Sequence, residues 1–348
     1  MRIWSGNIPV QRYKNDIAGQ NPVFLHSEMG KLSWTYTGHG RRYHAWADHC
    51  RKRYGGRVQK VAVDAGFTCP NRDGTVGVGG CTFCNNDGFN PSYCQHAATM
   101  TDQIQQGLRF VKKRYPRSRF FVAYLQAYSN THATLERLKE VYREALDHPD
   151  IQGLVIATRP DCVDEEKLGY LRELSHKYYI KLEYGLESCH DVTLERINRG
   201  HTFADSVRAL ELTAQYGLDA GIHLLFGLPG ETRNMMLDQV DLVNGLPVQS
   251  LKMHQLQIVK GTAMSVEYHN HPERFELFTL DDYLLFVARF LERLRPDIAI
   301  ERLSGEVPIP LQEGLSWGRL RADQVQNRLD LLMQQRDTWQ GKFLTGAR

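Results

Sequence analysis

The chain has 348 residues, of which 42% are hydrophobic and 24% charged, so it has enough apolar side chain for a sizeable core and is not a disordered or low-complexity protein. Its net charge is only +3, and no apolar run reaches the ~18 residues of a membrane-spanning helix. The amino terminus lacks the apolar segment of a signal peptide, so we expect a cytoplasmic protein with reduced thiols and no membrane partner.

Apolar runs of β-forming residues alternate with amphipathic stretches along most of the chain. Residues 1–42 show no periodicity and are predicted to form an irregular extension, followed by a short helix over 44–53. Strands are predicted over 60–63, 120–126, 153–158, 180–185, 220–226 and 251–258, with one further candidate strand over 298–303. Helices are predicted over 101–115, 135–146, 165–176, 203–216, 235–246 and 280–294.

Strands that alternate with helices of this length form βα units around a parallel sheet. About six such units favour an α/β fold of the partial, open TIM-like barrel type over a doubly wound sheet. We therefore expect three regions: the irregular extension over 1–42, the barrel over 43–303, and a carboxyl-terminal extension over 304–348 that covers the barrel mouth.

Three cysteines lie in a glycine-rich loop directly after the first predicted strand. Eleven residues separate Cys69 from Cys81, and two separate Cys81 from Cys84. Thiolates are ligands of iron–sulfur clusters and of zinc. Three of them around a four-iron cluster leave one iron open to a small molecule, whereas Cys94 could supply the fourth thiolate of a structural zinc site. The loop by itself leaves a cluster, a zinc site and unligated thiols open as interpretations.

The other predicted strands also end in small or polar residues. Because the carboxyl ends of parallel strands meet at one rim, a single ligand could contact all of these segments. They are 126–131 after the second strand, 158–161 after the third, 183–188 across the end of the fourth and 227–231 after the fifth. His201, His223 and His254 lie near the same rim and are not assigned as metal ligands.

Taken in order, these segments resemble the radical S-adenosylmethionine (SAM) superfamily, and within it the Fe–S oxidoreductases related to the Elongator-type radical SAM proteins. The resemblance runs from about residue 43 to the carboxyl terminus and is carried by 67–74, 126–128, 158–161, 198–201, 227–231 and 336–341. Two features depart from the general pattern. The first cysteine gap is eleven residues where most members have three, and 126–130 stands where Gly-Gly-Glu usually follows the second strand.

The resemblance implies a [4Fe-4S] cluster held by Cys69, Cys81 and Cys84, with SAM on the open iron. One electron breaks the C5′–S bond of SAM, and the 5′-deoxyadenosyl radical takes hydrogen from the substrate. Arg199, with Arg196 as the alternative, is implied to bind the SAM carboxylate through two hydrogen bonds. The other implied SAM contacts are Phe83 beside the adenine, Gln126, Ser129 and Asn130 for the amine, Glu183 and Glu187 for the amine or ribose, and Gly227, Pro229 and Gly230 under the adenine, with Glu231 capping the next helix. No catalytic residue on the substrate side is assigned.

The charge distribution bears on the substrate. Residues 1–120 carry 18 Lys and Arg against 7 Asp and Glu, whereas the rest of the chain carries 25 against 33. A polyanion-binding face would produce this asymmetry, and so would a set of solvated helix faces. With the Elongator-type resemblance it predicts modification of the C5 side chain of a tRNA wobble uridine, with an external electron donor such as flavodoxin or ferredoxin. A small metabolite or peptide is the alternative substrate, and a zinc-stabilised RNA-binding module without redox chemistry is the alternative of another class.

Overall fold

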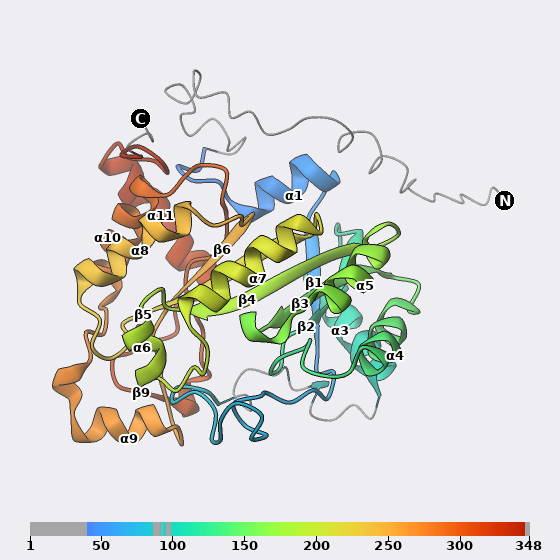
Figure 1. The fold of residues 1–348 in the computed structure, drawn as a ribbon. Coiled ribbons are helices and arrows are strands. Elements are labelled where there is room, and N and C mark those ends of the chain that lie inside the picture. Colours follow the sequence, from blue (N-terminus) through green and yellow to red (C-terminus); the bar gives the residue numbers. More distant parts are fainter. Residues whose placement is uncertain (1–39, 86–90, 92, 95–98, 345–348) are drawn as a thin grey trace.

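The computed structural model describes residues 40–85, 91, 93–94 and 99–344. Its centre is a curved sheet of seven strands in the order β1-β2-β3-β4-β5-β6-β8, and each strand runs parallel to its neighbours. The strands are β1 (Val58–Val63), β2 (Phe120–Leu125), β3 (Ile151–Thr158), β4 (Tyr179–Glu187), β5 (Asp219–Phe226), β6 (Ser250–Gln255) and β8 (Ala299–Arg302). The open α/β barrel predicted from the alternation of strands and helices is therefore confirmed (Figure 1).

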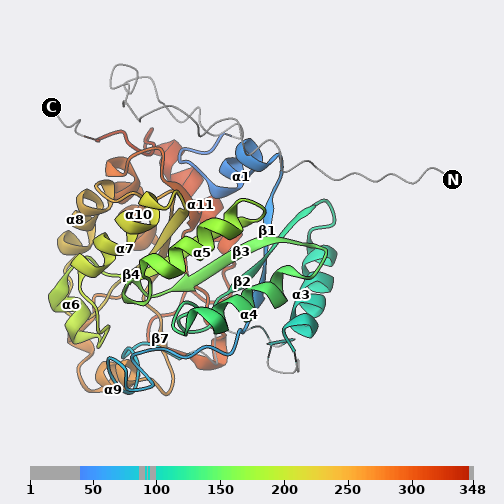
Figure 2. The same cartoon turned by 45° about the vertical axis from the view of Figure 1, so that its right-hand side comes forward.

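Helices cover the outer face of this sheet (Figures 1 and 2). They are α3 (Met100–Arg114), α4 (Leu135–Leu146), α5 (Glu165–Ser175), α7 (Phe203–Gln215), α8 (Arg233–Asn244) and α10 (Leu280–Arg293). All except α5 begin after a threonine whose side chain accepts a hydrogen bond from a backbone N–H of the first turn. Asp164 plays the same part for α5, and each such cap stabilises a helix by about 1 kcal/mol. Among the described helices, none has the length and apolar character needed to cross a membrane.

Several short elements and one long helix escaped the sequence analysis. The predicted strand over 251–258 ends early as β6, and β7 (Ile258–Val259) leaves the sheet to pair antiparallel with β9 (Gln312–Glu313). The missed helices are α6 (Asp191–Arg196), α9 (Ala263–Asn270) and α11 (Ala322–Gln335). Helix α9 buries only Met264 and Ser265, so it has no apolar stripe to detect. Helix α11 buries residues 325, 329 and 333, a spacing of four that does indicate a helix.

The two edge strands, β1 and β8, are joined by side chains instead of a strand ladder. Lys60 of β1 forms an ion pair with Glu301 of β8, with 2.8 Å between Nζ and Oε2. Residues 44–45 form a single parallel bridge with Ile300, which places α1 (Trp46–Tyr54) beside this seam. Between β1 and β8 the barrel is therefore open in its backbone: the Lys60–Glu301 ion pair links the two strands, and the bridge at Ile300 attaches the segment before α1 to β8.

The segment after β8 reaches both ends of the barrel. Gly305 and Val307 line the cavity described below. Farther along, the Gln340 side chain donates to the carbonyl oxygens of Arg295 and Ile298, which precede β8 at the amino-terminal end of the sheet. The cavity lining thus includes residues from the start of the extension, whereas residue 340 lies at the end of the barrel opposite the mouth.

Candidate functional site

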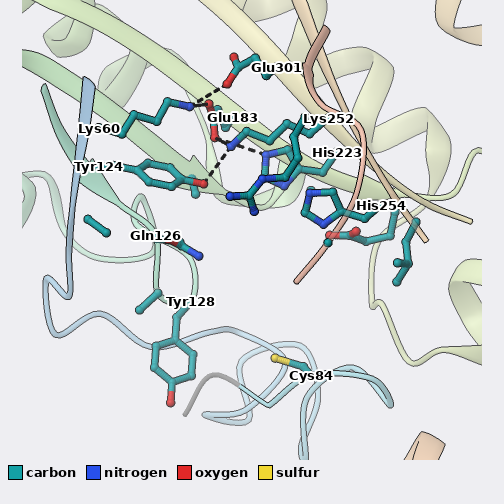
Figure 3. Close-up of a pocket in the computed structure, with 18 of the residues that line it drawn as sticks. Lys60, Cys84, Tyr124, Gln126, Tyr128, Glu183, His223, Lys252, His254 and Glu301 are labelled. Atoms are coloured by element: carbon teal, nitrogen blue, oxygen red, sulfur yellow. Dashed lines mark hydrogen bonds and ion pairs between the residues drawn. The ribbon is translucent and has the colours of Figure 1, made fainter. Parts of the chain in front are cut away.

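A cavity of about 740 Å³ lies inside the open barrel. Cys69, Cys81 and Cys84 line one end of it, beside the carboxyl ends of the strands. At the other end it is lined by Trp46 of α1 and by Phe110, Val111, Arg114 and Tyr115 at the end of α3. The view in Figure 3 shows Tyr128 and Cys84 at one side of the cavity, Gln126 between, and a group of charged side chains farther in.

The cysteine loop is shaped by its own backbone. The N–H groups of Arg72 and Asp73 donate to the carbonyl oxygen of Cys69, and the N–H of Cys84 donates to that of Cys81 at 3.0 Å. Gly80 has φ +81°, and a Cβ there would lie 2.9 Å from Nε of Arg72. The loop therefore needs glycine at this position to bring the cysteines onto one wall of the cavity.

The Asn198-Arg199-Gly200 segment holds this loop from the other side. The Asn71 side chain donates to the carbonyl oxygen of Asn198, and Asn198 Nδ2 donates back to the Gly80 oxygen at 2.8 Å. Gly200 has φ +73°, and a Cβ on it would lie 2.5 Å from Oδ1 of Asn71. These contacts fix the segment that carries Arg199 directly under the cysteines.

Arg199 is a buried cation beside the cysteines. Its Nη1 lies 3.5 Å from Sγ of Cys81, and its Nη2 donates to the Gly185 oxygen at 2.5 Å and lies 3.7 Å from Glu187. Its Nε is buried without a hydrogen-bond partner in the described structure. Burial raises the pKa of Glu187, and Arg199 opposes that shift. Arg199 therefore brings positive charge and an unused donor to the cavity wall.

The metal-binding alternatives can be compared with the positions of the cysteines. No three His, Cys, Asp or Glu side chains in the described part of the chain could hold a single metal ion. Cys94 is not among the residues that line the cavity, and its Sγ faces the Ala62 oxygen at 3.6 Å. The described residues thus offer no ligand set for one zinc ion. A four-iron cluster sets its thiolates farther apart, and three cysteines on one cavity wall suit it.

Of the predicted SAM contacts after β2, the structure places only Gln126 on the cavity. Ser129 Oγ lies 2.9 Å from Thr158 Oγ1 and accepts from the Arg159 N–H, while Asn130 Nδ2 donates to three backbone oxygens. Both side chains are fully buried and brace the ends of β2 and β3. Tyr128, which was not predicted, lines the cavity and has φ 61°, an uncommon value for a residue with a side chain.

Of the predicted adenine contacts, too, only some line the cavity. Phe83 lines the cavity, whereas Gly227, Pro229 and Gly230 are not part of its lining. Glu231 was expected to cap the following helix, but Thr232 caps α8 instead. The Glu231 carboxylate accepts hydrogen bonds from Ser188 and Gln239, so it links the ends of β4 and β5.

Glu183 lies deeper in the barrel than predicted. It precedes Glu187 by four residues on β4, which is about 13 Å along a strand. Its carboxylate forms ion pairs with Lys60 and Lys252, and His223 Nε2 lies 3.3 Å away (Figure 3). Burial would raise the pKa of Glu183, but the lysines outweigh burial and hold it well below its usual range. Its two oxygens are therefore taken by neighbouring cations and not free for a SAM amine.

This charged group inside the barrel was missed by the sequence analysis. Lys181 of β4 is fully buried, pairs with Glu301 and donates to Ser250. Burial lowers the pKa of Lys252 well below its usual range. Part of the signal was present in the sequence, because Lys60 and Lys181 interrupt strand runs that are otherwise mainly apolar. A charged residue in such a run is rarely buried without a partner.

Comparisons with known proteins agree with this geometry. A family model described as "Radical SAM superfamily" matches residues 69–243, and one described as "Radical_SAM C-terminal domain" matches residues 248–330. YtqA of Bacillus subtilis (strain 168) is 36% identical over 318 residues, which cover 90% of this chain and 97% of that protein. YhcC of Escherichia coli (strain K12) is 38% identical over 76% of this chain and 84% of its own length.

More distant similarity reaches the Elongator proteins. Elongator complex protein 3 of Schizosaccharomyces pombe is 27% identical over 53% of this chain and 34% of that protein. The solved structure of Methanocaldococcus infernus Elp3 has a TM-score of 0.60 at 17% identity, over 81% of this chain and 64% of that one, and shows a shared fold. The two family models together span most of the described barrel, and the match to YtqA extends over nearly the whole length of both proteins. The chain therefore belongs to the radical SAM superfamily, whose members use a [4Fe-4S] cluster and SAM.

Proposed function

We propose that the protein is a radical SAM enzyme whose cluster is held by Cys69, Cys81 and Cys84. The observation that carries this is the placement of three cysteines on one wall of a barrel cavity, with Arg199 beside them. When bound, the cluster supplies one electron to SAM, which yields methionine and a 5′-deoxyadenosyl radical that takes hydrogen from the substrate. The electron comes from an external donor of the flavodoxin or ferredoxin class.

The remaining residues of the cavity wall would hold SAM. Arg199 binds its carboxylate, Gln126 and Glu187 accept hydrogen bonds from its amine or ribose, and Phe83 contacts its adenine. Arg159 positions Arg199, because its Nη1 donates to the Arg199 oxygen at 2.6 Å. Asp161 holds the Arg159 guanidinium through two hydrogen bonds of 2.9 and 2.7 Å. A guanidinium held at both sides in this way is a rigid support.

The substrate we propose is tRNA, at the C5 side chain of a wobble uridine. The Elongator-type resemblance suggests it, and the distribution of basic residues supports it. The basic runs at the ends of α1 and α3 precede β1 and β2, so both lie at the amino-terminal end of the sheet. Arg114 lines the cavity there, beside the exposed Phe110. Cations beside an exposed aromatic ring are a common arrangement for binding nucleic acid.

The cluster assignment is tested by paired cysteine variants. Anaerobically reconstituted wild type is expected to carry about four irons per chain and to convert SAM to 5′-deoxyadenosine with a strong reductant. Cys81→Ser is expected to lose both properties, whereas Cys94→Ser, which changes a buried cysteine outside the cavity, keeps them. Equal iron content and SAM cleavage in the two variants would contradict the assignment.

The tRNA assignment is tested separately by binding and by turnover. If about six phosphates are neutralised, raising the salt from about 50 to 200 mM weakens tRNA binding by about a thousandfold. Incubation with SAM, reductant and bulk tRNA, followed by nucleoside mass spectrometry, should show one uridine derivative of changed mass. Binding that does not respond to salt, together with unchanged nucleosides, would leave the radical chemistry standing and reject tRNA.

A further inference from the structure

Strands β6 and β8 bring two cations to adjacent positions inside the barrel. Their pairing starts with Ser250 opposite Ala299 and Leu251 opposite Ile300, and then shifts so that Lys252 stands opposite Arg302. Glu301 is the extra residue of this β-bulge. As a result Glu301 and Arg302, although consecutive, both line the cavity together with Lys252.

Lys252 and Arg302 differ in the number of hydrogen-bond and ion-pair partners that the protein gives them. Lys252 pairs with Glu183 and donates to the Tyr124 hydroxyl at 3.1 Å. Arg302 is exposed and makes no hydrogen bond or ion pair to any residue that the structure describes, so its guanidinium is open to a ligand in the cavity. Its charge is close enough to act on Lys252 and His254. Like charges directly opposite each other in a sheet are destabilising. An anion between them would remove this repulsion.

His254 adds a third polar group to the same place. It lies on β6 two residues beyond Lys252, on the same face of the strand, and lines the cavity (Figure 3). Its ring stacks on that of His223, with 6.0 Å between centroids. Its Nε2 is buried and has no hydrogen-bond partner in the described structure. A buried ring nitrogen without a partner is unfavourable, so this atom is available to a ligand.

The charge of the whole group points to the sign of that ligand. The cations are Lys60, Lys181, Lys252 and Arg302, and the carboxylates are Glu183 and Glu301. Burial lowers the pKa of His223 to about 4 and that of His254 well below its usual range, so both rings are neutral at pH 7. Burial likewise lowers the pKa of Lys181 to about 7 and that of Lys252 well below its usual range, whereas Arg302 is an exposed guanidinium that lines the cavity. An anion bound here would pair with Arg302 and would favour the charged form of Lys252.

We propose that Lys252, Arg302 and His254 bind an anionic group of the substrate, a carboxylate or a phosphate, inside the barrel. The inference rests on the proposed function, because it places the substrate in the cavity that the cysteines line. Lys252 precedes the end of β6 by three residues, about 10 Å along the strand. The anionic end of the substrate therefore lies deeper than the cysteines, and the reacting carbon lies between the two.

Direct anion binding tests the site without turnover. Inorganic phosphate and acetate are titrated into cluster-reconstituted protein by isothermal titration calorimetry. Wild type is expected to bind at least one of them, and Arg302→Gln to bind it about tenfold or more weakly, because a hydrogen bond between charged groups is lost. Arg302→Lys keeps the charge and is expected to lie between the two. Tighter binding of phosphate or of acetate identifies the substrate group as phosphate or carboxylate.

The controls separate this inference from the function on which it rests. Arg319→Gln removes an exposed arginine outside the cavity and is expected to bind both anions like wild type. Wild type saturated with SAM is expected to bind phosphate or acetate with an unchanged Kd. Equal binding by wild type and Arg302→Gln, or loss of anion binding when SAM is added, would overturn the proposal. A protein that binds anions through Arg302 but cleaves no SAM would refute the proposed function and keep this site.

Discussion

Arg199 places a buried positive charge between the cysteine loop and Glu187. Its guanidinium lies 3.5 Å from Sγ of Cys81 and 3.7 Å from Glu187, and the residue is only 7% exposed. If Cys81 holds the cluster as we propose, a positive charge this close to its thiolate favours the reduced form of the cluster, because reduction adds negative charge. We therefore expect the residue that we propose for the SAM carboxylate also to raise the reduction potential of the cluster.

Replacing Arg199 by Met is expected to lower the reduction potential of the reconstituted cluster by roughly 100 mV, the scale of a unit charge about 6 Å away at an effective dielectric constant of about 20. Arg199→Lys keeps the charge and is expected to retain most of the potential while binding SAM more weakly. Redox titration followed by electron paramagnetic resonance measures this. Arg196→Met, which changes a partly exposed arginine paired with Glu267, is the control. Equal potentials in Arg199→Met and wild type would contradict the argument.

At this scale the sequence predicts which strand ends carry the site, but not which side chains face it. Gln126 and Asn130 both follow β2, and only Gln126 reaches the cavity. The left-handed backbone at Tyr128 turns the chain between them, and Asn130 is used to satisfy carbonyl oxygens at the ends of β2 and β3. Such local hydrogen bonding of asparagine to backbone competes with any ligand-binding role and cannot be read from spacing.

At the scale of elements, the inner face of the sheet is unusual because its centre is charged. Glu183 on β4 forms ion pairs with Lys60 of β1 and Lys252 of β6, so its carboxylate connects strands that are not neighbours in the sheet. Its folded-state pKa is depressed, so the ionised form stabilises the fold. This contribution is present above the unfolded pKa, near 4.5, and is lost as the pH falls through the folded value.

Glu183→Gln is expected to lower the free energy of unfolding at pH 7 by about 3–5 kcal/mol, because it leaves buried lysines without their partner. The gap to wild type should narrow as the pH falls below about 4.5, since wild type then loses the same interaction. Urea unfolding at several pH values measures both effects. Glu140→Gln, which changes an exposed pair with Arg137 on α4, is expected to follow wild type throughout. A gap that stays constant with pH would show that ionisation of Glu183 is not what stabilises the fold.

The seven strands of the sheet and the six helices on its outer face could be predicted to within a few residues, because strand and helix periodicities differ and each of these helices begins after a capping residue. The bulge in β8 could not be predicted from the sequence. Glu301 and Arg302 are consecutive and would alternate in a regular strand, and only the shifted pairing with β6 places both on the cavity. The pairing register of a short strand depends on tertiary packing, which local sequence does not encode.

At the scale of the whole molecule, the two ends of the described chain meet at the amino-terminal end of the barrel. Gln340 connects them: its backbone N–H donates to the Arg42 oxygen, and its side chain accepts from the His44 N–H. The same side chain donates to the oxygens of Arg295 and Ile298. It therefore satisfies three backbone groups of separate segments from a buried position.

Gln340→Ala is expected to lower the free energy of unfolding by about 2–4 kcal/mol, because it leaves buried backbone groups without partners. The melting temperature should fall accordingly in a thermal unfolding experiment. Iron content after reconstitution should stay at the wild-type level, since the residue lies at the opposite end from the cysteines. Gln335→Ala on the exposed face of α11 is the matched control. An unchanged melting temperature would mean that the carboxyl-terminal segment is only loosely attached.

The seam between β1 and β8 has a consequence for how wide the barrel can be. A fully hydrogen-bonded barrel has a circumference fixed by its strand number and stagger. Here β1 and β8 are linked by the Lys60–Glu301 ion pair, and the bridge at Ile300 comes from the segment before α1, so the barrel can be made wider or narrower without separating any two paired strands. Substitution of a few side chains at this seam would therefore change the width of the cavity for larger or smaller substrates without altering the cysteine loop.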